Sequence, residues 1–392
     1  MTAARPLRAL LVDPSLFTAP YDAALTDGLV AAGVTPTWAV RPTRKGDREL
    51  LAREHTDDFF YRRVDNLTGW PASLRAVAKG SAHVAGLVRL LQRVATRRPD
   101  VVHFQWAVLP PLDALAIVFI RQFCPVLVTV HDTTPNNGDR LPLLQGLAFD
   151  LPIKLADRVI VHTRSARDTL VKRGISADKV SVIPHGPLEF RGQFRKVRAP
   201  RTDERWTFVL FGELKHYKGI DVLVEAVRLL PLELRRKARF IVAGRPRMDL
   251  APLLRKIAEL QLEETIEVRP HRLSEEEMED LFAVTDCYVF PYRQIDASGV
   301  YFLVKGRGNW LIATRVGIFA EDLRDGIDGE LVPVDDAPCL SDALARSIVA
   351  RAVPPRNTTG DAWSFIGRAT GAAYRQSIDC HPARAPRSVA AE

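Results

Sequence analysis

The sequence predicts an α/β protein made of two consecutive doubly wound, Rossmann-like domains. Three observations predict this fold. The chain has 392 residues, which is too many for one ordinary hydrophobic core. Short, continuous apolar runs, typical of strands buried on both faces, alternate with helical stretches. This alternation occurs twice, on either side of a basic and irregular segment, so we expect a central cleft between two parallel sheets.

The first series of strands and helices fills the N-terminal half of the chain. Strands are expected over 8–13, 100–104, 126–130 and 158–162, and helices over 21–32, 82–97, 110–122 and 165–173. Gly33 follows the first helix at a C′ position, where a left-handed glycine ends many helices. Strands and helices in this order are typical of a parallel sheet with helices on both faces.

The second series begins after the basic segment. Strands are expected over 207–211, 239–244, 265–268, 286–290 and 310–314, with helices between them. We therefore expect an N-terminal domain over 1–190, a linker over 191–204 and a C-terminal domain over 205–360. A last helix within 361–380 is expected to cross back to the first domain. The tail 381–392, rich in Ala, Pro and Arg, is expected to be disordered.

Composition and charge limit the classes of protein. With 47% hydrophobic and 26% charged residues, the chain is globular, neither fibrous nor disordered. Its most apolar segment, 109–120, is too short to span a bilayer, and no apolar signal core precedes the first strand, so we expect a cytoplasmic protein. The four cysteines are scattered, which argues against a zinc site or a disulfide framework. A net charge of +8 favours anionic partners without choosing among them.

The strongest local signal is the segment 211–221. A strand ends, Gly212 permits a tight turn, and Lys218-Gly219 precedes an amphipathic helix that starts at Ile220. A helix N-terminus offers free N–H groups and a positive dipole end to an anion, and the amines of Lys215 and Lys218 suit a diphosphate. From the residues alone, a solvated basic loop is an equally good interpretation.

This segment resembles the Phe-Gly-x-x-x-x-x-Lys-Gly element of GT-B glycosyltransferases, above all glycosyltransferase family 4. There it starts the donor-binding domain, and Lys218 matches the family's phosphate-binding lysine. Further motifs fit the family in order and spacing over about residues 8–335; they are Thr129-Val130-His131-Asp132, Ile183-Pro184-His185-Gly186, Phe290-Pro291-Tyr292 and Ser298-Gly299-Val300. The resemblance implies the GT-B fold and transfer of a hexosyl unit from a nucleotide diphosphate sugar to a hydroxyl acceptor, with retention of configuration and no cofactor.

The resemblance also implies a donor site in the second domain. Its residues are Gly212, Lys215, Lys218, Gly219, Arg245, His271, Ser298, Gly299 and Val300. For Arg245, an exposed arginine without a donor contact is an equally good interpretation. Lys218, with Lys215, would neutralise the charge that develops on the leaving diphosphate. Because basic residues can replace a metal and no Asp-x-Asp pair flanks a donor loop, we expect metal independence. One departure matters: the family's two glutamates, the second of which holds the donor ribose, are replaced by Ile295 and Leu303.

In the first domain the resemblance assigns His131 to contact with the transferred sugar and hence to catalysis. The alternative is an ordinary strand-end histidine, as we expect for His103, His162, His185 and His216. Asp13 and Asp22 lie in the first loop and are predicted acceptor contacts, with solvated turn aspartates as the alternative. If the enzyme inverts configuration it needs a general base, and Asp132 or Asp22 is the first candidate.

Other functions stay open from the sequence. The missing glutamates fit a catalytically degenerate GT-B protein that binds a nucleotide sugar. A GT-B sugar-nucleotide epimerase would use acid–base groups and no acceptor. The charge permits nucleic-acid binding, but no aromatic–basic motif supports it. The acceptor is a carbohydrate, a lipid-linked or a small molecule. The basic helix near 83–98 is either a solvated face over a buried stripe or a peripheral contact with the inner face of the membrane.

Overall fold

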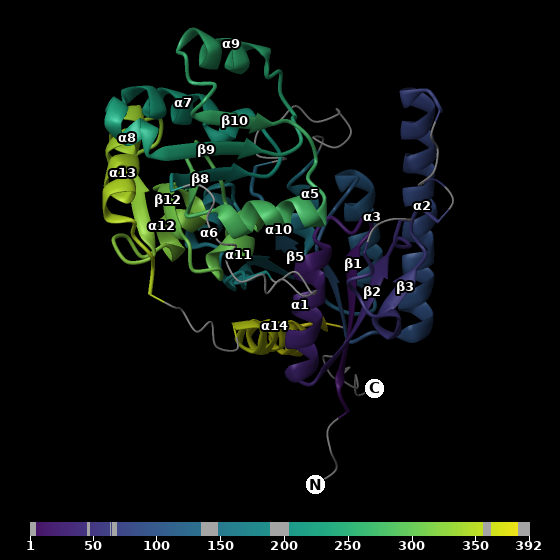
Figure 1. Cartoon of the computed structure of the whole chain (residues 1–392). Helices are drawn as coiled ribbons and strands as arrows, with labels where there is room; N and C mark the ends of the chain where they lie inside the picture. The colour runs from purple at the N-terminus through teal and green to yellow at the C-terminus, as the bar shows by residue number, and fades with distance from the viewer. Residues whose placement is uncertain are drawn as a thin grey trace, which may run out of the picture. The chain divides into compact units, whose positions relative to one another are not determined.

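The computed structural model describes residues 5–44, 48–62, 64, 69–134, 148–188, 204–355 and 362–382 (Figure 1). The chain divides into two compact units, Met1–Gly186 with Gly360–Glu392, and Pro187–Thr359. The predicted linker 191–204 lies outside the described residues except for Glu204, and the predicted tail 381–392 lies outside them except for His381 and Pro382.

The first unit contains a seven-stranded sheet in the order β3-β2-β1-β4-β5-β6-β7. Its strands are β1 (Leu7–Asp13), β2 (Val34–Val40), β3 (Thr56–Asp58), β4 (Val101–Phe104), β5 (Val126–Val130), β6 (Arg158–Val161) and β7 (Val180–Val182). All of these strands pair in parallel. The strand order changes direction between β1 and β4. Ligands of open α/β sheets bind beyond the carboxyl ends of the strands at such a switch point.

Helices flank the first sheet. They are α1 (Ala19–Ala31), α2 (Ala72–Arg97), α3 (Pro110–Ile120), α5 (Leu151–Leu155), α6 (Arg164–Lys172) and α14 (Ala362–Asp379). Although α1 and α14 are far apart in the sequence, they lie side by side (Figure 1). A Cβ atom added to Gly28 of α1 would lie 2.2 Å from the carbonyl oxygen of Trp363 in α14. The two helix backbones therefore touch, and only glycine fits at this contact.

The second unit contains a six-stranded sheet in the order β10-β9-β8-β11-β12-β13. Its strands are β8 (Trp206–Phe211), β9 (Ala238–Ala243), β10 (Ile266–Arg269), β11 (Cys287–Phe290), β12 (Trp310–Thr314) and β13 (Gly329–Val332). These strands are also all parallel. Here the switch point lies between the neighbouring strands β8 and β11, so the loops that follow these two strands are the natural place for a ligand.

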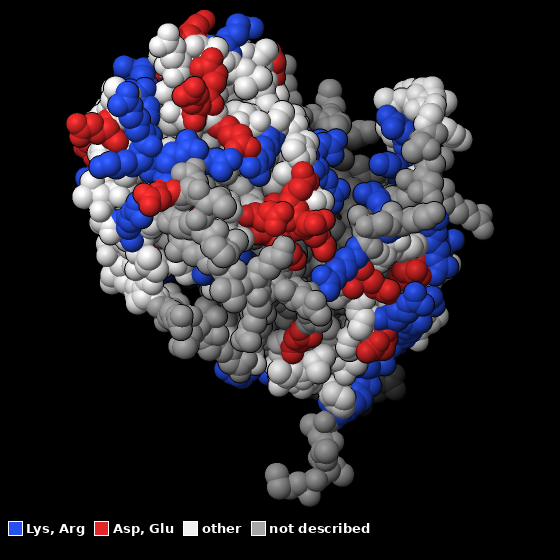
Figure 2. All heavy atoms as spheres, in the orientation of Figure 1, with Lys and Arg blue, Asp and Glu red and all other residues white. Residues whose placement is uncertain are grey.

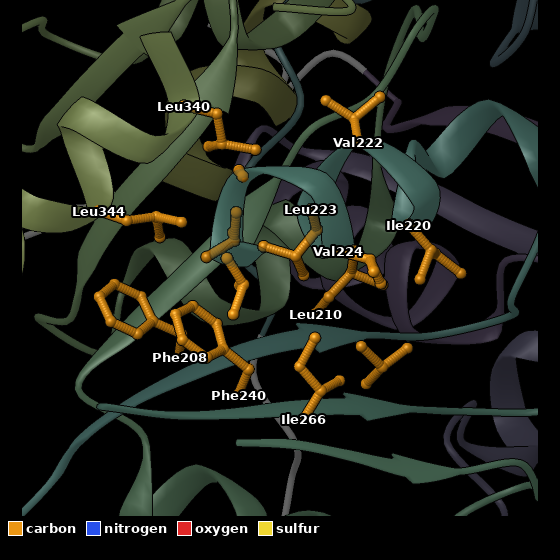
Figure 3. Close-up of a cluster of buried hydrophobic side chains, with 14 of the residues drawn as sticks. Phe208, Leu210, Ile220, Val222, Leu223, Val224, Phe240, Ile266, Leu340 and Leu344 are labelled. Atoms are coloured by element: carbon orange, nitrogen blue, oxygen red, sulfur yellow. The ribbon is translucent and has the colours of Figure 1, made fainter. Parts of the chain in front are cut away.

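The helices of the second unit are α7 (Ile220–Leu229), α8 (Leu232–Arg236), α9 (Ala251–Glu259), α10 (Glu275–Val284), α11 (Gly299–Lys305), α12 (Gly317–Asp322) and α13 (Ala337–Ala350). The apolar stripe of α7 packs on the sheet (Figure 3): Ile220, Leu223 and Val224 share one core with Phe208 and Phe240. Burying each such side chain stabilises the fold by about 1.5–3 kcal/mol. This packing fixes where α7 begins, and therefore where the loop from β8 must end.

The predicted α/β class with two doubly wound sheets is confirmed, but several elements differ from expectation: the expected strands do not include β2, β3, β7 or β13, and α2 starts earlier than expected. The sequence does not predict β2, because Pro36 interrupts its apolar pattern. The structure explains why a proline is tolerated: β3 pairs only with Trp38–Val40, so the part of β2 that contains Pro36 has β1 alone as a neighbour. Helix α2 starts at Ala72, ten residues before the expected start, because its first turns are exposed and carry no buried stripe.

Candidate functional site

The lysine loop, residues 212–219, joins β8 to α7 in the second unit. Gly212 and Gly219 both have left-handed backbone angles, with φ of +106° and +63°. A Cβ atom on Gly219 would lie 2.0 Å from the carbonyl oxygen of Pro291, which follows β11. The loop is thus held against the segment after β11, on the two strands that flank the switch point, and glycine is required for this approach.

Lys218 is buried in this loop, with 3% of its surface exposed. Its Nζ donates a hydrogen bond to the carbonyl oxygen of Phe211 at 3.0 Å and lies 5.2 Å from the centroid of the Tyr292 ring. Burial lowers the pKa of Lys218 to about 7, partly opposed by the charge of Glu213. The interpretation as a solvated basic loop is therefore wrong for Lys218. At neutral pH the amine is therefore a mixture of the neutral and the protonated form, and a bound anion would favour the protonated form.

Several predicted donor residues meet at Lys218. A Cβ atom on Gly212 would lie 2.8 Å from both Lys218 Nζ and Val300 Cγ2. Ser298 is buried and caps α11, its Oγ accepting a hydrogen bond from the backbone N–H of Tyr301 at 3.3 Å. The structure thus brings the lysine loop together with the Ser298–Val300 turn.

The remaining predicted donor residues have other surroundings. Lys215 forms an ion pair with Glu213 at 3.7 Å. Arg245 is exposed, and its carbonyl oxygen accepts a hydrogen bond from Leu214 N at 2.9 Å, which places it beside the lysine loop. His271 lies 2.9 Å from Glu277 Oε1, in the capping group of α10. For all three, contact with a donor stays a prediction.

The two positions where glutamates are expected are apolar in character. Ile295 is buried in one hydrophobic core with Tyr292 and Phe319, and Leu303 packs against that core. Neither position offers a polar side chain for a ribose.

In the first unit, Asp13 and Asp22 are both fully buried. Asp13 ends β1 and accepts hydrogen bonds from the backbone N–H groups of Thr18 and Ser15 at 3.1 and 3.3 Å. Thr18 Oγ1 lies 3.3 Å from Asp22 Oδ1. Burial raises the pKa of both carboxyls, and the neighbouring Asp13 raises that of Asp22 further. Solvated turn aspartates are therefore the wrong interpretation: the pair holds the loop after β1, while direct acceptor contact stays a prediction.

His131 belongs to a continuous chain of close polar contacts near the carboxyl ends of β4, β5 and β6. We call it the histidine chain; its members are Tyr374, His103, Gln105, His131 and His162. Tyr374 Oη lies 2.7 Å from His103 Nδ1, and His103 Nε2 lies 3.5 Å from Gln105 Nε2. At its other end, Gln105 Oε1 lies 3.1 Å from His131 Nε2. His131 Nδ1 in turn lies 3.3 Å from His162 Nε2. The register that pairs Val130 with Val161 places His131 beside His162.

Burial keeps the histidine chain neutral. It lowers the pKa of His162 to about 4, that of His103 to about 3 and that of His131 well below its ordinary value. Neutral His162 donates from Nδ1 to the Ile183 carbonyl at 3.0 Å, so its Nε2 accepts from His131 Nδ1–H. His131 Nε2 then carries the lone pair, which faces Gln105 Oε1 at 3.1 Å; because both atoms are acceptors in this tautomer, they do not hydrogen-bond to each other. A sugar hydroxyl that contacts this nitrogen must replace Gln105, and that contact stays a prediction.

The comparisons with known proteins agree with this geometry. Residues 23–186 match the family model described as Glycosyltransferase Family 4, and residues 205–349 match the one described as Glycosyl transferases group 1. The chain is a family 4-like glycosyltransferase with the GT-B fold.

This glycosyltransferase is 26% identical over 334 residues to the D-inositol 3-phosphate glycosyltransferases of Mycobacterium ulcerans and Mycobacterium marinum, with 79% of this chain and 70% of each relative covered. Among solved structures it is similar to HepE of Anabaena in complex with UDP, with a TM-score of 0.62 and 16% identity over 95% of this chain and 96% of that one. It is also similar to the sucrose-phosphate synthase of Thermosynechococcus elongatus, with a TM-score of 0.64 and 18% identity over 96% and 94%. At these identities the solved structures show the fold.

Sequence reasoning missed most of the histidine chain around the glycosyltransferase's His131. His103 and His162 are expected to be ordinary strand-end histidines, yet both hydrogen-bond within the chain. One signal was present: three successive predicted strands have a histidine at or next to their last residue, and the carboxyl ends of parallel strands share one edge of the sheet. In the described part of the chain no three His, Cys, Asp or Glu side chains are placed to bind a metal ion, and no helix there has the length and apolarity of a membrane span.

Proposed function

We propose that this glycosyltransferase moves a hexosyl unit from a nucleotide diphosphate sugar to a hydroxyl acceptor. The observation that carries the proposal is the buried amine of Lys218, placed after β8 at the switch point of the second sheet. HepE, which has the same fold, has been solved with UDP and with UDP-glucose. A UDP-sugar is therefore the first donor to test.

In this proposal the lysine loop binds the diphosphate through Lys218, Lys215 and the backbone around Gly212 and Gly219. The N-terminal turn of α7 adds N–H groups and its dipole. As the bond to the sugar breaks, negative charge grows on the leaving diphosphate, and fixed positive groups stabilise it most in that state. These amines would supply the charge that a metal ion supplies in other transferases, so we propose a metal-independent reaction. The resemblance to family 4 supports retention of configuration, which we also propose.

The other predicted residues have separate proposed roles in each unit. Ser298, Gly299 and Val300 would adjoin the donor sugar, and Arg245 and His271 would contact its nucleotide. In the first unit His131 would accept a hydrogen bond from a sugar hydroxyl. Asp13 and Asp22 would act on the acceptor through the loop that they hold.

A thermal-shift panel of nucleoside diphosphates and their sugars tests the proposal, because a ligand of the folded state raises the melting temperature. Lys218→Ala should abolish most sugar transfer and the shift while the free protein still unfolds cooperatively. Lys256→Ala, which removes a surface lysine paired with Glu225, serves as the matched control and should keep both. Full transfer by Lys218→Ala would refute the assignment.

A catalytically degenerate binding protein is the second candidate, favoured by the apolar Ile295 and Leu303 at the two expected glutamate positions. It predicts a thermal shift with a nucleotide sugar but no transfer or hydrolysis. An epimerase predicts a changed sugar without an acceptor. Product analysis of one incubation with a radiolabelled nucleotide sugar separates these outcomes.

We further propose that helices α2 and α3 contact the inner face of an anionic membrane, which would suit a lipid-linked acceptor. Exposed apolar side chains lie on both helices; they are Val77, Val84 and Val88 on α2 and Leu115, Val118 and Phe119 on α3. Helix α2 also carries Arg75, Lys79, Arg89, Arg93 and Arg97 and no acidic residue. At the upper right of Figure 2, the described residues at the end of α2 are accordingly white and blue. Apolar insertion combined with basic charge is how peripheral helices bind anionic lipids.

Sedimentation with vesicles of phosphatidylglycerol and phosphatidylcholine tests this contact. Wild type should co-sediment with the anionic vesicles and be released by salt. Phe119→Glu should reduce binding, whereas Val349→Glu, a substitution at a residue that is 72% exposed on α13, should not. Equal binding by both variants would refute the assignment of α2 and α3.

A further inference from the structure

We propose that the hydroxyl of Tyr292 is a further donor-binding group, which hydrogen-bonds the diphosphate of the nucleotide sugar beside Lys218. This inference rests on the proposed function. Tyr292 follows β11 and is 1% exposed. Its hydroxyl is buried and forms no hydrogen bond of ordinary geometry among the described residues, although the side chain of Ser298 is near enough to interact with it. A buried, unsatisfied polar group destabilises the protein, and one at a ligand site commonly gains its partner from the ligand.

The position of Tyr292 in the fold links it to Lys218. Lys218 is in the loop after β8 and Tyr292 is in the segment after β11, and these strands are neighbours at the switch point. Lys218 Nζ lies over the Tyr292 ring, and Tyr217 packs edge-on against that ring with centroids 5.5 Å apart. Arg293 N–H donates to the Tyr217 carbonyl at 2.7 Å. The phenol and the amine are thus presented from two segments that are tied together.

The Ser298–Val300 turn lies beside both groups. Val300 Cγ2 and Lys218 Nζ both adjoin Gly212, and the side chain of Ser298 lies next to the phenol. With Lys218 only 3% exposed and Tyr292 only 1% exposed, a diphosphate that reaches the amine must displace side chains at this turn. The same displacement opens the phenol to the ligand. One event therefore makes both groups available.

The chemistry of the two groups is complementary. Diphosphate oxygens only accept hydrogen bonds, and a phenol whose pKa burial raises well above its ordinary value keeps its proton to donate. Lys218 supplies charge without a fixed direction, whereas Tyr292, clamped between Phe290 and Phe319 in the core, supplies a directed donor. The pair therefore selects a ligand that offers more than one anionic oxygen, as a diphosphate does.

Tyr292→Phe tests the proposal, with Tyr288→Phe as the matched control. Tyr288 lies inside β11, is fully buried and also has a hydroxyl without a hydrogen-bond partner among the described residues. The binding of UDP, GDP and ADP is measured by calorimetry for the wild type and both variants. We expect Tyr292→Phe to bind the preferred nucleotide about tenfold more weakly, the usual effect of losing a hydrogen bond to a charged group. Tyr288→Phe should bind it as the wild type does.

Stability provides the second measurement. Because both substitutions remove an unsatisfied hydroxyl, both variants should melt no lower than the wild type without ligand, so weaker binding cannot result from partial unfolding. Wild-type affinity in Tyr292→Phe would overturn the role of Tyr292 and leave the diphosphate site in place. A wild type that binds none of the three nucleotides would overturn the diphosphate site, and the role of Tyr292 with it.

Discussion

Donor binding by Lys218 should depend on pH, because burial holds the pKa of this amine at about 7 in the free protein. A diphosphate placed beside the amine favours its charged form and raises that pKa. Binding therefore takes up a proton whenever the free amine is neutral. The charged fraction is about nine tenths at pH 6, half at pH 7 and one tenth at pH 8. If only the charged form binds, the dissociation constant rises roughly tenfold from pH 6 to pH 8.

Calorimetry with UDP-glucose measures this linkage directly. A nucleotide sugar is the better probe, because its diphosphate has no group that titrates near neutral pH. Titrations in two buffers with different ionisation enthalpies give the number of protons taken up, expected to be about one half at pH 7 and about nine tenths at pH 8. The affinity should fall over the same interval.

Lys218→Arg is the control, because a guanidinium stays charged throughout this range. The variant should bind with weak or no pH dependence and without proton uptake, whatever its absolute affinity. Tight binding by the wild type with a constant affinity from pH 6 to pH 8 and no proton uptake would refute the reasoning. It would mean that Lys218 is charged before the ligand arrives.

Three further predictions follow from the packing and charge of single residues. Burial lowers the pKa of His162 from 6.5 to about 4. Between these two pH values only the unfolded chain binds the proton. The stability that His162 contributes therefore decreases as the pH is lowered, by about 2 kcal/mol at pH 5. The raised pKa values of Asp13 and Asp22 change the stability in the opposite direction, so the wild type must be compared with His162→Asn by urea unfolding at both pH 7 and pH 5. The loss of unfolding free energy caused by the substitution should be about 2 kcal/mol smaller at pH 5 than at pH 7. An equal loss at both pH values would contradict this prediction. Gly28→Ala forces a Cβ atom to within 2.2 Å of the Trp363 carbonyl and should lower the unfolding free energy by about 1–3 kcal/mol, whereas Gly80→Ala, with nothing within 4 Å, should leave it unchanged or raise it by up to about 1 kcal/mol. Gly219→Ala and Gly326→Ala both place alanine at positive φ, but only the first meets a neighbouring backbone, that of Pro291; UDP binding measured by calorimetry should be lost in Gly219→Ala and kept in Gly326→Ala, and equal binding would show that the approach to Pro291 is dispensable.

The fold could be predicted from sequence because burial on both faces of a parallel sheet leaves a strong pattern. Runs such as 126–130 and 207–211 are apolar at nearly every position, and both are strands in the structure. Strand β2 was not predicted, because it contains a proline. That proline is tolerated because the short β3 does not reach it, which is a property of the assembled sheet. The start of α2 was not predicted, because its first turns are exposed and show no stripe of buried apolar residues.

The candidate site could be predicted only in part, for a different reason. Lys218 and its glycines lie together in one local motif, so a short stretch of sequence reveals them. The histidine chain is assembled from β4, β5, β6 and α14, whose members are up to 271 residues apart. Tyr292 stands in a recognisable motif, but its unsatisfied hydroxyl is visible only once the packing around it is known. Hydrogen bonds between distant segments leave no periodicity in the sequence.

Because α14 packs on α1, the first unit is built from segments that lie before and after the second unit in the sequence. Its last components, Trp363 against Tyr21 and Tyr374 against His103, leave the ribosome only after residues 187–359 have been made. At about 5–20 residues per second, this delay is roughly 10 to 35 s. During that interval the newly made N-terminal sheet lacks its final helix, while the second unit already has its whole sequence. We therefore expect the second unit to finish folding before the first unit, although synthesis of the first unit begins earlier.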